Sequence, residues 1–538
     1  MSSDDAIEPL PEDVVAALAA PAFHPAHPAR VEHVQTHISH VFLAGDDVYK
    51  LKKAVRFSFL DFATRARRRF FCAEELRLNR RLAAPVYVDV VDVVRRADGT
   101  LALGGPGEPV EPVLHMRRLP DDRLLPALLA AGAVDAAMMT ALARRIAAFH
   151  RDAPTGGKIA AEGSPEMVHR RFAEALATLH PFVGRVLFAE EYAALAGTAE
   201  WFVRMQAPLL RARQAAGRIR EGHGDLHAEH VCFVDAAASA AGGALPPGIY
   251  VFDCIEFSQA LRCNDVASEV AFLVMDLEFR GRGDLAAAFV AAYVEAAEDP
   301  EVPQLVPYYA AYRASVRAMV AALTSATPEV EASVRAQARE RAASYVALAL
   351  RSAWRCGDPE LIVCCGRSGT GKSTIAAALA EITEGVVVRS DVIRKRGDRA
   401  GVPPPSDRYG APRRAEVYAA LCREVASELA AGRTVIADAT FLRRADRDAV
   451  AAVAARCGRR VLFIETTATP ETVRTRLAAR TADDVSDARF DTYMAQAAEA
   501  APWGGDHRHV AVATDGEPGA ARAAALGKLF ARRMDVGH

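Results

Sequence analysis

A glycine-rich loop in the C-terminal third of the chain is the feature that most constrains its fold. Residues 366–373 read GRSGTGKS and match the pattern G-x-x-x-x-G-K-[ST] at every fixed position. The apolar segment ELIVCC (360–365) before the loop predicts a buried strand, and a helix is predicted from about residue 372. Strand, loop and helix in this order are the context in which the motif binds phosphate, so this part of the chain is expected to fold as an α/β domain.

The residue types in this loop fit the chemistry of a nucleoside triphosphate. Glycines let main-chain N–H groups surround phosphates, and the N-terminus of the helix adds partial positive charge. We expect Lys372 to reach the β- and γ-phosphates of ATP and to act in catalysis, and Ser373 to hold Mg²⁺. The predicted nucleotide-binding residues of the loop are Gly366, Arg367, Ser368, Gly369, Thr370, Gly371, Lys372, Ser373 and Thr374.

The spacing of apolar segments divides the chain. Beyond residue 358, strands are predicted at 360–365, 386–389, 434–438 and 461–465, alternating with helices at 413–431, 444–456 and 470–480. This alternation predicts a P-loop domain over 358–538, with a parallel sheet flanked by helices.

The part of the chain before residue 358 has a different order of predicted strands and helices. Residues 1–30 are expected to be a lead-in, and 31–352 to form a separate domain of mixed strands and helices. Its predicted elements are a hairpin at 40–45 and 48–53, a helix at 65–83, strands at 86–94, 231–234 and 248–253, and mostly helices over 120–220 and 260–352.

Two acidic residues follow strands of the predicted parallel sheet. Asp438 ends the segment TVIAD, where it can hold the metal ion through water. Ala439 and Thr440 follow it, and the lack of an acid at these positions favours transfer to a bound acceptor over ATP hydrolysis that drives motion. Asp391 follows VVVRS and can orient or deprotonate an acceptor hydroxyl at the carboxyl end of its strand. Its alternative role is a helix N-cap, together with Ser390.

Arginines cluster on the predicted helix at 470–480. Arg476 and Arg480 share a helix face at i, i+4 spacing, with Arg474 nearby. They could close over the transferring phosphate as a lid, because guanidinium groups stabilise the charge that develops there. They could equally form a solvated helix face, and both interpretations stay open at this stage.

These motifs together resemble a known group of enzymes. GRSGTGKS, SDVIRKR, VIADAT and the arginine-bearing helix are similar to the small P-loop kinases related to gluconate kinase, polynucleotide 5′-kinase and zeta-toxin kinases, over about 358–520. The resemblance implies phosphoryl transfer from ATP to a hydroxyl, and it leaves the acceptor open.

A second constellation lies in the N-terminal half. His223–Val231 reads HGDLHAEHV, and the strand IYVFD ends 28 residues after Asp225 in Asp253. An HxD loop, a hairpin and an acid at a strand end follow the order of protein-kinase-like enzymes, in which Asp225 would accept the hydroxyl proton and Asp253 would bind Mg²⁺.

The same order of motifs suggests a lysine upstream for the phosphates. Lys50 lies on the predicted hairpin and could pair with the α- and β-phosphates, held by Glu74 or Glu75 of the following helix. Lys52 and Lys53 are interpreted as solvated side chains, although Lys52 shares a strand face with Lys50 and is the alternative phosphate lysine.

The N-terminal pattern resembles the aminoglycoside phosphotransferase family, whose usual loop is HGDxHxxN, over roughly 35–345. With DCIEFSQALRCNDVASEVAFL and VYKLKKAVRFSFLDFAT, the whole chain is similar to bacterial proteins in which a phosphotransferase-like domain is fused to an ATP-binding domain. The resemblance implies a protein-kinase-like fold for 31–352. It places His230 at the metal-binding Asn position, although imidazole is a poor ligand for Mg²⁺. No G-x-G-x-x-G loop precedes Lys50.

Other polar residues have competing interpretations. The spacing of His223, His227 and His230 also suggests zinc, but Asp225 and Asp253 fit the kinase order better. Asp265 is interpreted as a helix cap or structural acceptor. The remaining histidine cluster is interpreted as surface or packing residues: His33, His37 and His40.

Composition limits the remaining classes of function. The net charge of −2 argues against a general nucleic-acid or membrane-surface binder, and no run of 18 apolar residues predicts a membrane span. Nine cysteines without a CxxC pair and an acidic N-terminus indicate the cytoplasm. The expected cofactors are ATP and Mg²⁺, and the expected partner is a small-molecule hydroxyl acceptor. A nucleic acid is expected only as a polynucleotide 5′-end acceptor, and the oligomeric state is left open.

Three functional hypotheses follow from the sequence. Both halves could be kinases; the N-terminal half could be a binding or regulatory module; or the C-terminal half could be a nucleotide-driven switch or ATPase without an acceptor.

Overall fold

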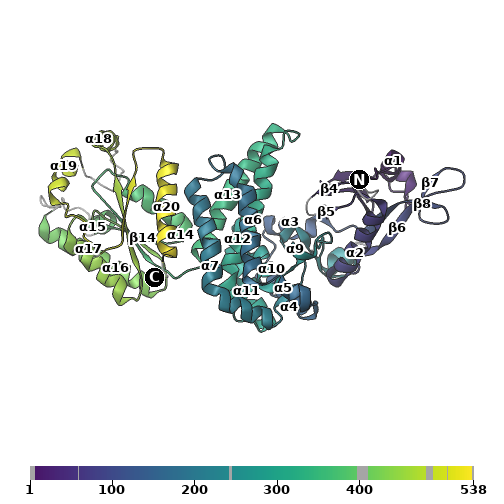
Figure 1. Cartoon of the computed structure of the whole chain (residues 1–538), viewed down its shortest axis with the longest axis horizontal. Coiled ribbons are helices and arrows are strands. Elements are labelled where there is room, and N and C mark those ends of the chain that lie inside the picture. Colours follow the sequence, from purple (N-terminus) through teal and green to yellow (C-terminus); the bar gives the residue numbers. More distant parts are fainter. Residues whose placement is uncertain are drawn as a thin grey trace. The chain divides into compact units, whose positions relative to one another are not determined.

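The computed structural model of the chain describes residues 7–57, 60–240, 245–396, 410–479, 489–505 and 507–535 (Figure 1). The chain forms two compact units, each assembled from two segments. The first contains Met1–Val168 and Gln206–Ala310, and the second His169–Met205 and Ala311–His538. The predicted domain boundary at 352–358 falls within the second unit and stays a prediction.

Within the described ranges, the first unit is built on a six-stranded antiparallel sheet of order β1-β2-β3-β8-β6-β7. The strands are β1 (Glu32–Gln35), β2 (Ser39–Ala44), β3 (Asp47–Lys52), β6 (Tyr87–Arg95), β7 (Leu101–Leu103) and β8 (Glu108–Arg117). The predicted hairpin is confirmed, because β2 pairs with β3 and Val41 lies opposite Lys50. One face of the sheet packs on α1 (Glu12–Ala19) through Phe42, Leu51 and Val14.

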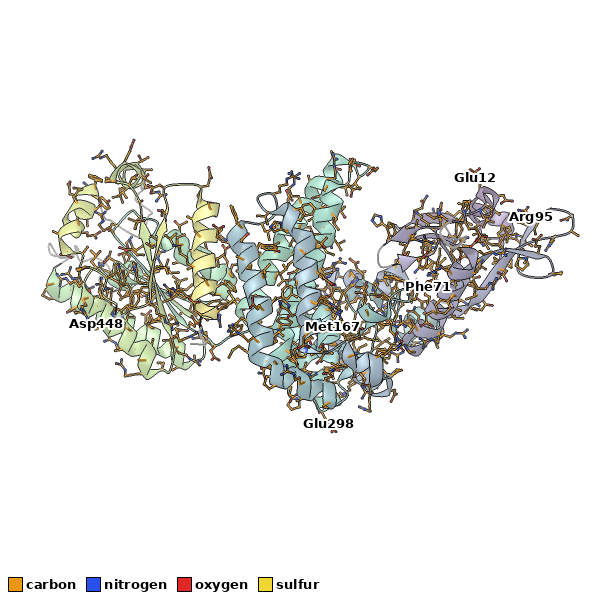
Figure 2. All side chains as sticks on the ribbon, in the orientation of Figure 1. Glu12, Phe71, Arg95, Met167, Glu298 and Asp448 are labelled. Atoms are coloured by element: carbon orange, nitrogen blue, oxygen red, sulfur yellow. The ribbon has the colours of Figure 1, made fainter. Side chains whose placement is uncertain are left out.

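Helix α2 (Arg65–Ala83) has the bounds that the sequence predicts. It begins after Thr64, whose hydroxyl accepts a hydrogen bond from the amide of Arg67 and so satisfies one unpaired N–H of the first turn. Phe71 of α2, labelled in Figure 2, packs against Phe62 with the ring centroids 5.2 Å apart. These contacts fix the helix beside a two-stranded ladder of β4 (Arg56–Phe57) and β5 (Leu60–Asp61).

The rest of the first unit carries the HGDLHAEHV loop. Strand β9 (Ile219–Glu221) precedes the loop and pairs with β12 (Cys263–Asp265), and β10 (Val231–Val234) follows it and pairs with β11 (Gly248–Val251). Both ladders are antiparallel. Helix α10 (Val266–Phe279) is buried along nearly all its length, and Asp265 caps it by accepting a hydrogen bond from Ala267, which confirms the interpretation of Asp265. The adjoining helices are α3 (Leu125–Ala130), α4 (Ala136–Asp152), α5 (Gly157–Ala161), α8 (Ala236–Ala240), α9 (Gln259–Arg262) and α11 (Gly283–Ala297).

The second unit contains a five-stranded parallel sheet of order β14-β15-β13-β16-β17 among its described residues. The strands are β13 (Leu361–Cys365), β14 (Val386–Arg389), β15 (Val435–Asp438), β16 (Val461–Thr467) and β17 (His509–Ala513). After β13 the chain builds one side of the sheet and then crosses to the other, so a switch point lies at the carboxyl end of β13. Ligands of open α/β sheets bind at such a point.

The helices of the second unit cover this sheet and continue into a helical part. They are α14 (Lys372–Thr383), α15 (Ser390–Arg396), α16 (Ala411–Ala430), α17 (Arg444–Arg456), α18 (Pro470–Ala478), α19 (Phe490–Glu499) and α20 (Pro518–Met534). The helical part contains α13 (Ala332–Trp354) and most of α6 (Pro165–Leu179), α7 (Ala189–Ala215) and α12 (Val302–Ala326). A Cβ atom on Gly527 of α20 would lie 2.8 Å from Cβ of Glu190, so α20 approaches α7 closely.

The predicted mixed α/β class is confirmed: an antiparallel sheet with helices precedes a P-loop domain with a parallel sheet. Among the described residues, no helix combines the length and the apolar character needed to cross a membrane.

Candidate functional site

The glycine-rich loop lies between β13 and α14, at the switch point of the parallel sheet. Gly366 has φ +128°, and a Cβ atom there would lie 2.5 Å from the carbonyl oxygen of Thr466. Gly371, the residue before the helix, has φ +89°. Both positions therefore require glycine, because a larger residue would be strained or would collide with the neighbouring strand.

The functional side chains of the loop lie beside the second sheet acid. The ammonium of Lys372 donates to the carbonyl of Arg367 across the loop at 2.9 Å. The hydroxyl of Ser373 donates to Oδ2 of Asp438 at 2.6 Å, and Asp438 is buried at the end of β15. Hydroxyl and carboxylate oxygens are the ligands that Mg²⁺ prefers, so this pair fits a magnesium site.

Two cavities meet at this loop. The first has a volume of about 310 Å³ and lies between the loop, α18 and the start of α20; the second has a volume of about 240 Å³ and lies toward α15, α16 and α19. Lys372 and Ser373 line both cavities. A nucleotide in one and an acceptor in the other would therefore meet at these two side chains.

Arg476 lies in the first cavity. Its guanidinium donates to Oγ1 of Thr514 at 3.0 Å and also to the carbonyl of Thr514. Arg474 lies over the ring of Phe490, with Cζ 4.5 Å from the centroid. Arg480 lies outside the described residues, so its predicted place in a lid stays a prediction.

The second cavity is lined mainly by polar and charged groups. Asp391 lies in the first turn of α15 and forms an ion pair with Arg394. Arg414 pairs with Glu499 at 3.0 Å. Burial raises the pKa of Tyr418 to about 12, so this phenol stays protonated and can take part in hydrogen bonds.

Helix α19 holds the loop from the other side, through residues that the motifs did not reveal. Gln496 accepts a hydrogen bond from the amide of Ser368 at 2.7 Å and donates to its hydroxyl at 3.1 Å. The guanidinium of Arg367 lies 4.0 Å from the ring centroid of Tyr493. No sequence motif predicts either contact, because both depend on how α19 packs on the glycine-rich loop.

In the first unit, Lys50 connects two predicted site residues. Its ammonium lies 2.7 Å from Oε1 of Glu75 and 2.9 Å from Oδ1 of Asp253. Burial alone would lower the pKa of Lys50, but the charges of Asp253 and Glu75 outweigh burial and raise the pKa well above its ordinary value. Glu75, not Glu74, holds this lysine; Glu74 pairs with Arg77 instead.

The expectation that Lys52 is solvated is wrong. Its side chain is 1% exposed, and its ammonium contacts Oε2 of Glu75 at 2.6 Å and the carboxylate of Glu256. Burial alone would lower the pKa of Lys52, but Glu256 and Glu75 raise it above the ordinary range. Lys53 has an exposed hydrogen bond to the carbonyl of Thr36 at 2.7 Å. Lys52 is buried and Lys53 is exposed because successive residues of a strand point to opposite faces. Lys50 and Lys52, two residues apart, face α2 together.

The HGDLHAEHV loop brings Asp225, His227 and His230 together. Oδ2 of Asp225 lies 3.4 Å from Nε2 of His227 and 3.4 Å from Nδ1 of His230. Nε2 of His230 lies 3.5 Å from Oδ2 of Asp253, whose φ of +61° follows the end of β11. Burial alone would raise the pKa of Asp225, but its interactions with His227 and His230 lower the pKa well below its usual range.

A carboxylate behind this loop positions it. Glu269 of α10 accepts a hydrogen bond from the amide of Gly224, and it contacts Nε2 of His150 at 2.8 Å. His150 in turn contacts the hydroxyl of Tyr293 at 2.7 Å. No local pattern indicates the role of Glu269, because its partner His150 is 119 residues away in the chain.

The residues around His230 do not fit the magnesium site of a kinase. Where hard oxygen ligands are needed, the loop offers an imidazole ring between two carboxylates. The other histidine cluster lies on β1 and β2 or between them. His33 and His40 contact each other at 3.0 Å, and His33 stacks on Phe42, which agrees with a packing role.

The fold and the two sites define a class: a P-loop unit with a parallel sheet, combined with a unit that holds the HGDLHAEHV loop beside an antiparallel sheet. A family model described as an AAA domain matches residues 361–501. The uncharacterized protein Rv2004c of Mycobacterium tuberculosis is 32% identical over 480 residues, covering 88% of this chain and 91% of that protein. Protein Mb2027c of Mycobacterium bovis, also uncharacterized, matches with the same identity and coverage. The chain belongs to the family of these mycobacterial proteins.

Solved structures also resemble parts of the chain. A sugar kinase from Janibacter sp. HTCC2649 is 20% identical, with a TM-score of 0.27, covering 33% of this chain and 99% of that one. A gluconokinase from Sinorhizobium meliloti 1021 is 21% identical, with a TM-score of 0.26, covering 34% and 98%. A choline/ethanolamine kinase family protein from Mesorhizobium loti is 16% identical, with a TM-score of 0.38, covering 62% and 94%.

Proposed function

We propose that the second unit transfers the γ-phosphoryl group of ATP to a hydroxyl of a small molecule. The observation that carries this proposal is the meeting of two cavities at Lys372 and Ser373. Phosphoryl transfer needs a donor and an acceptor in line on either side of the transferred group. Two cavities that share the phosphate-binding side chains support that arrangement.

Each residue has a role in this proposal. Lys372 and the main-chain amides of the loop bind the phosphates, and Ser373 and Asp438 hold Mg²⁺, which neutralises charge on the phosphate oxygens. Asp391 faces the acceptor cavity and orients the hydroxyl or accepts its proton, a role that typically contributes about 10²–10⁴-fold to a rate. Arg476 stabilises phosphate charge from the donor side.

The proposal favours transfer over a nucleotide-driven switch. A switch or ATPase needs only the donor cavity, whereas the second cavity contains arginines, a tyrosine and an amide that can bind a polar acceptor. The acceptor is a small polar molecule, or the 5′ end of a polynucleotide.

The first unit supports a second candidate function, nucleotide binding. The ion pairs of Lys50 with Glu75 and Asp253 place an ammonium where it could contact phosphates. A second phosphoryl transfer would require Asp225 as base, and His230 stands against Mg²⁺ at this site. Nucleotide binding without transfer is therefore the better-supported role for this unit.

The test uses the full chain with γ-labelled ATP and Mg²⁺, and acceptors that include sugar acids, nucleosides, polynucleotide ends and aminoglycosides. We expect one acceptor class to be labelled by the wild type and by Asp225→Ala, but not by Lys372→Ala. Lys158→Ala, which removes an exposed lysine of α5, is the matched control and should behave as the wild type. Labelling that survives in Lys372→Ala, or phosphate release that no acceptor changes, would contradict the proposal.

A further inference from the structure

The cluster of Asp225, His227 and His230 has the composition of a transition-metal site. Each residue offers one ligand atom, and the three atoms lie within 4.8 Å of one another. His227 is buried, and the other two side chains are partly accessible. Two imidazoles and one carboxylate form a set of ligands that zinc sites use.

The distances in the cluster match ligands that share one ion. Oδ2 of Asp225 lies 3.4 Å from a ring nitrogen of each histidine. Ordinary hydrogen bonds between such groups are shorter, about 2.7–3.2 Å. Ligands bound tetrahedrally at about 2.0–2.1 Å from Zn²⁺ are separated from one another by about 3.3 Å.

The surrounding contacts hold the two imidazoles in place. A short 3-10 turn, Ala228–His230, joins them, and its first amide donates to Oδ2 of Asp276 at 2.9 Å. Their ring centroids are 4.1 Å apart. The cluster is therefore assembled by the main chain of the loop and requires no large rearrangement to converge on one point.

Each ring nitrogen of His230 has an oxygen atom nearby that can accept a hydrogen bond. In the structure Nδ1 lies 2.9 Å from the main-chain oxygen of Asp225, so the proton is on Nδ1 and is donated there. When Nδ1 binds an ion, the neutral ring carries its proton on Nε2 instead, facing Oδ2 of Asp253 at 3.5 Å. A carboxylate behind a metal-binding imidazole is a common outer contact that orients the ring.

Charge also favours a cation here. Among the described residues, the basic side chains that contact the Asp225 carboxylate are these two histidines; Lys50 is engaged by Glu75 and Asp253. Both imidazoles are neutral when they bind a metal, so a divalent ion would balance the negative charge of the Asp225 carboxylate.

We propose that Asp225, His227 and His230 bind one Zn²⁺ ion in the first unit, with Asp253 as an outer contact. The site does not depend on the proposed phosphoryl transfer by the second unit. An ion at Asp225 engages the carboxylate that a kinase would use as base, which assigns this unit to metal-dependent binding and not to transfer.

Metal binding to the full chain tests the site. The metal-free protein is titrated with Co²⁺, whose visible absorption reports tetrahedral nitrogen and oxygen ligands, and equilibrium dialysis with Zn²⁺ gives the stoichiometry. We expect one equivalent of either ion to bind, and millimolar Mg²⁺ not to displace it. His230→Asn should weaken binding at least 100-fold, and Asp253→Asn by 10–100-fold.

Two controls keep the result clear. His33→Asn removes a histidine of the other cluster and should leave the Co²⁺ spectrum unchanged, and circular dichroism shows whether His230→Asn is folded. If that variant is unfolded, His230→Gln and His227→Gln replace it. The site is refuted if wild-type protein binds less than a tenth of an equivalent of Zn²⁺, or if folded His230 and His227 variants bind as the wild type does. Phosphoryl transfer by Lys372 is measured separately, so either proposal can fail alone.

Discussion

At the scale of single residues, the first unit depends on buried charges that neutralise one another. Lys52 has 1% of its side chain exposed and lies between the carboxylates of Glu75 and Glu256. Removing one member of such a group leaves charge buried without compensation, which costs more than the group itself stabilises.

We therefore predict that Lys52→Ala lowers the free energy of unfolding of the first unit by about 3–5 kcal/mol. The exposed neighbour gives the control, because Lys53→Ala should change it by less than about 0.5 kcal/mol. Urea unfolding followed by circular dichroism measures the change, and hydrogen exchange over 39–52 and 65–83 assigns it to this unit. Equal effects of the two substitutions would contradict the buried network.

The lowered pKa of Glu269 predicts that the free energy of unfolding depends on pH. Burial acts to raise the pKa of Glu269, but the hydrogen bond and charge of His150 outweigh burial and lower the pKa to about 2. The carboxylate binds its proton more weakly in the folded state, so its stabilisation is complete above the unfolded pKa of about 4.3 and is lost as the pH falls toward 2. The shift corresponds to about 3 kcal/mol.

The measurement is the free energy of unfolding as a function of pH. Wild-type protein should lose stability more steeply between about pH 5 and pH 2 than Glu269→Gln, which keeps the size of the side chain and removes its charge. Parallel curves for the two proteins would show that Glu269 has no lowered pKa.

At the scale of elements, the phosphate-binding loop is supported by a helix that no motif marks. Gln496 of α19 satisfies both the amide and the hydroxyl of Ser368. We predict that Gln496→Ala weakens ATP binding by about 5–10-fold, roughly 1 kcal/mol, because the loop amide loses its acceptor. Calorimetry with Mg²⁺-ATP measures this. Met494→Ala on the same helix, where Met494 is 54% exposed, should bind as the wild type.

The sequence predicted elements whose signals are local. Helix α2 and strands β10 and β14 have the predicted bounds, because apolar spacing and a cap define them without reference to the rest of the chain. Strand β17 and helix α20 were not predicted. HVAVA in β17 is short, and α20 is rich in alanine, so their place is decided by pairing with β16 and by packing on α14.

The residues of the candidate sites also divide into those that local sequence patterns predict and those that depend on packing. The loop from Gly366, the pair Ser373 and Asp438, and an acid of α2 as partner of Lys50 were predicted from the order and spacing of the motifs, whereas the contact of Lys50 with Asp253 was not. The choice of Glu75 over Glu74 and the burial of Lys52 required the packing of α2. Gln496 and Glu269 act across 128 and 45 residues, and no local pattern indicates such contacts.

At the scale of the whole molecule, the second unit joins α20 to the helical segment that contains the first half of α7. A Cβ atom on Gly527 would lie 2.8 Å from Cβ of Glu190, whereas one on Gly283 would meet nothing within 4 Å. Alanine usually stabilises a helix relative to glycine, by about 1 kcal/mol. The close approach at Gly527 reverses this preference.

We predict that Gly527→Ala lowers the stability of the second unit by about 1–3 kcal/mol, because the two helices must move apart. Gly283→Ala should leave stability unchanged or raise it by up to about 1 kcal/mol. Thermal unfolding reports the change, and fluorescence of Trp201, Trp354 and Trp503, all in the second unit, assigns it. A stabilised Gly527→Ala protein would show that the helices tolerate the extra methyl group.

The division of each unit into two stretches of chain has a consequence for synthesis. As the polypeptide leaves the ribosome, 169–205 emerges long before 311–538 exists to cover it, and Gln206–Ala310 completes the first unit in the interval. The apolar helix surface of 169–205 therefore stays exposed until 311–538 has been synthesised, while the first unit folds. We expect a chain that ends after residue 310 to be bound by chaperones, and a chain that extends to residue 538 to be free of them.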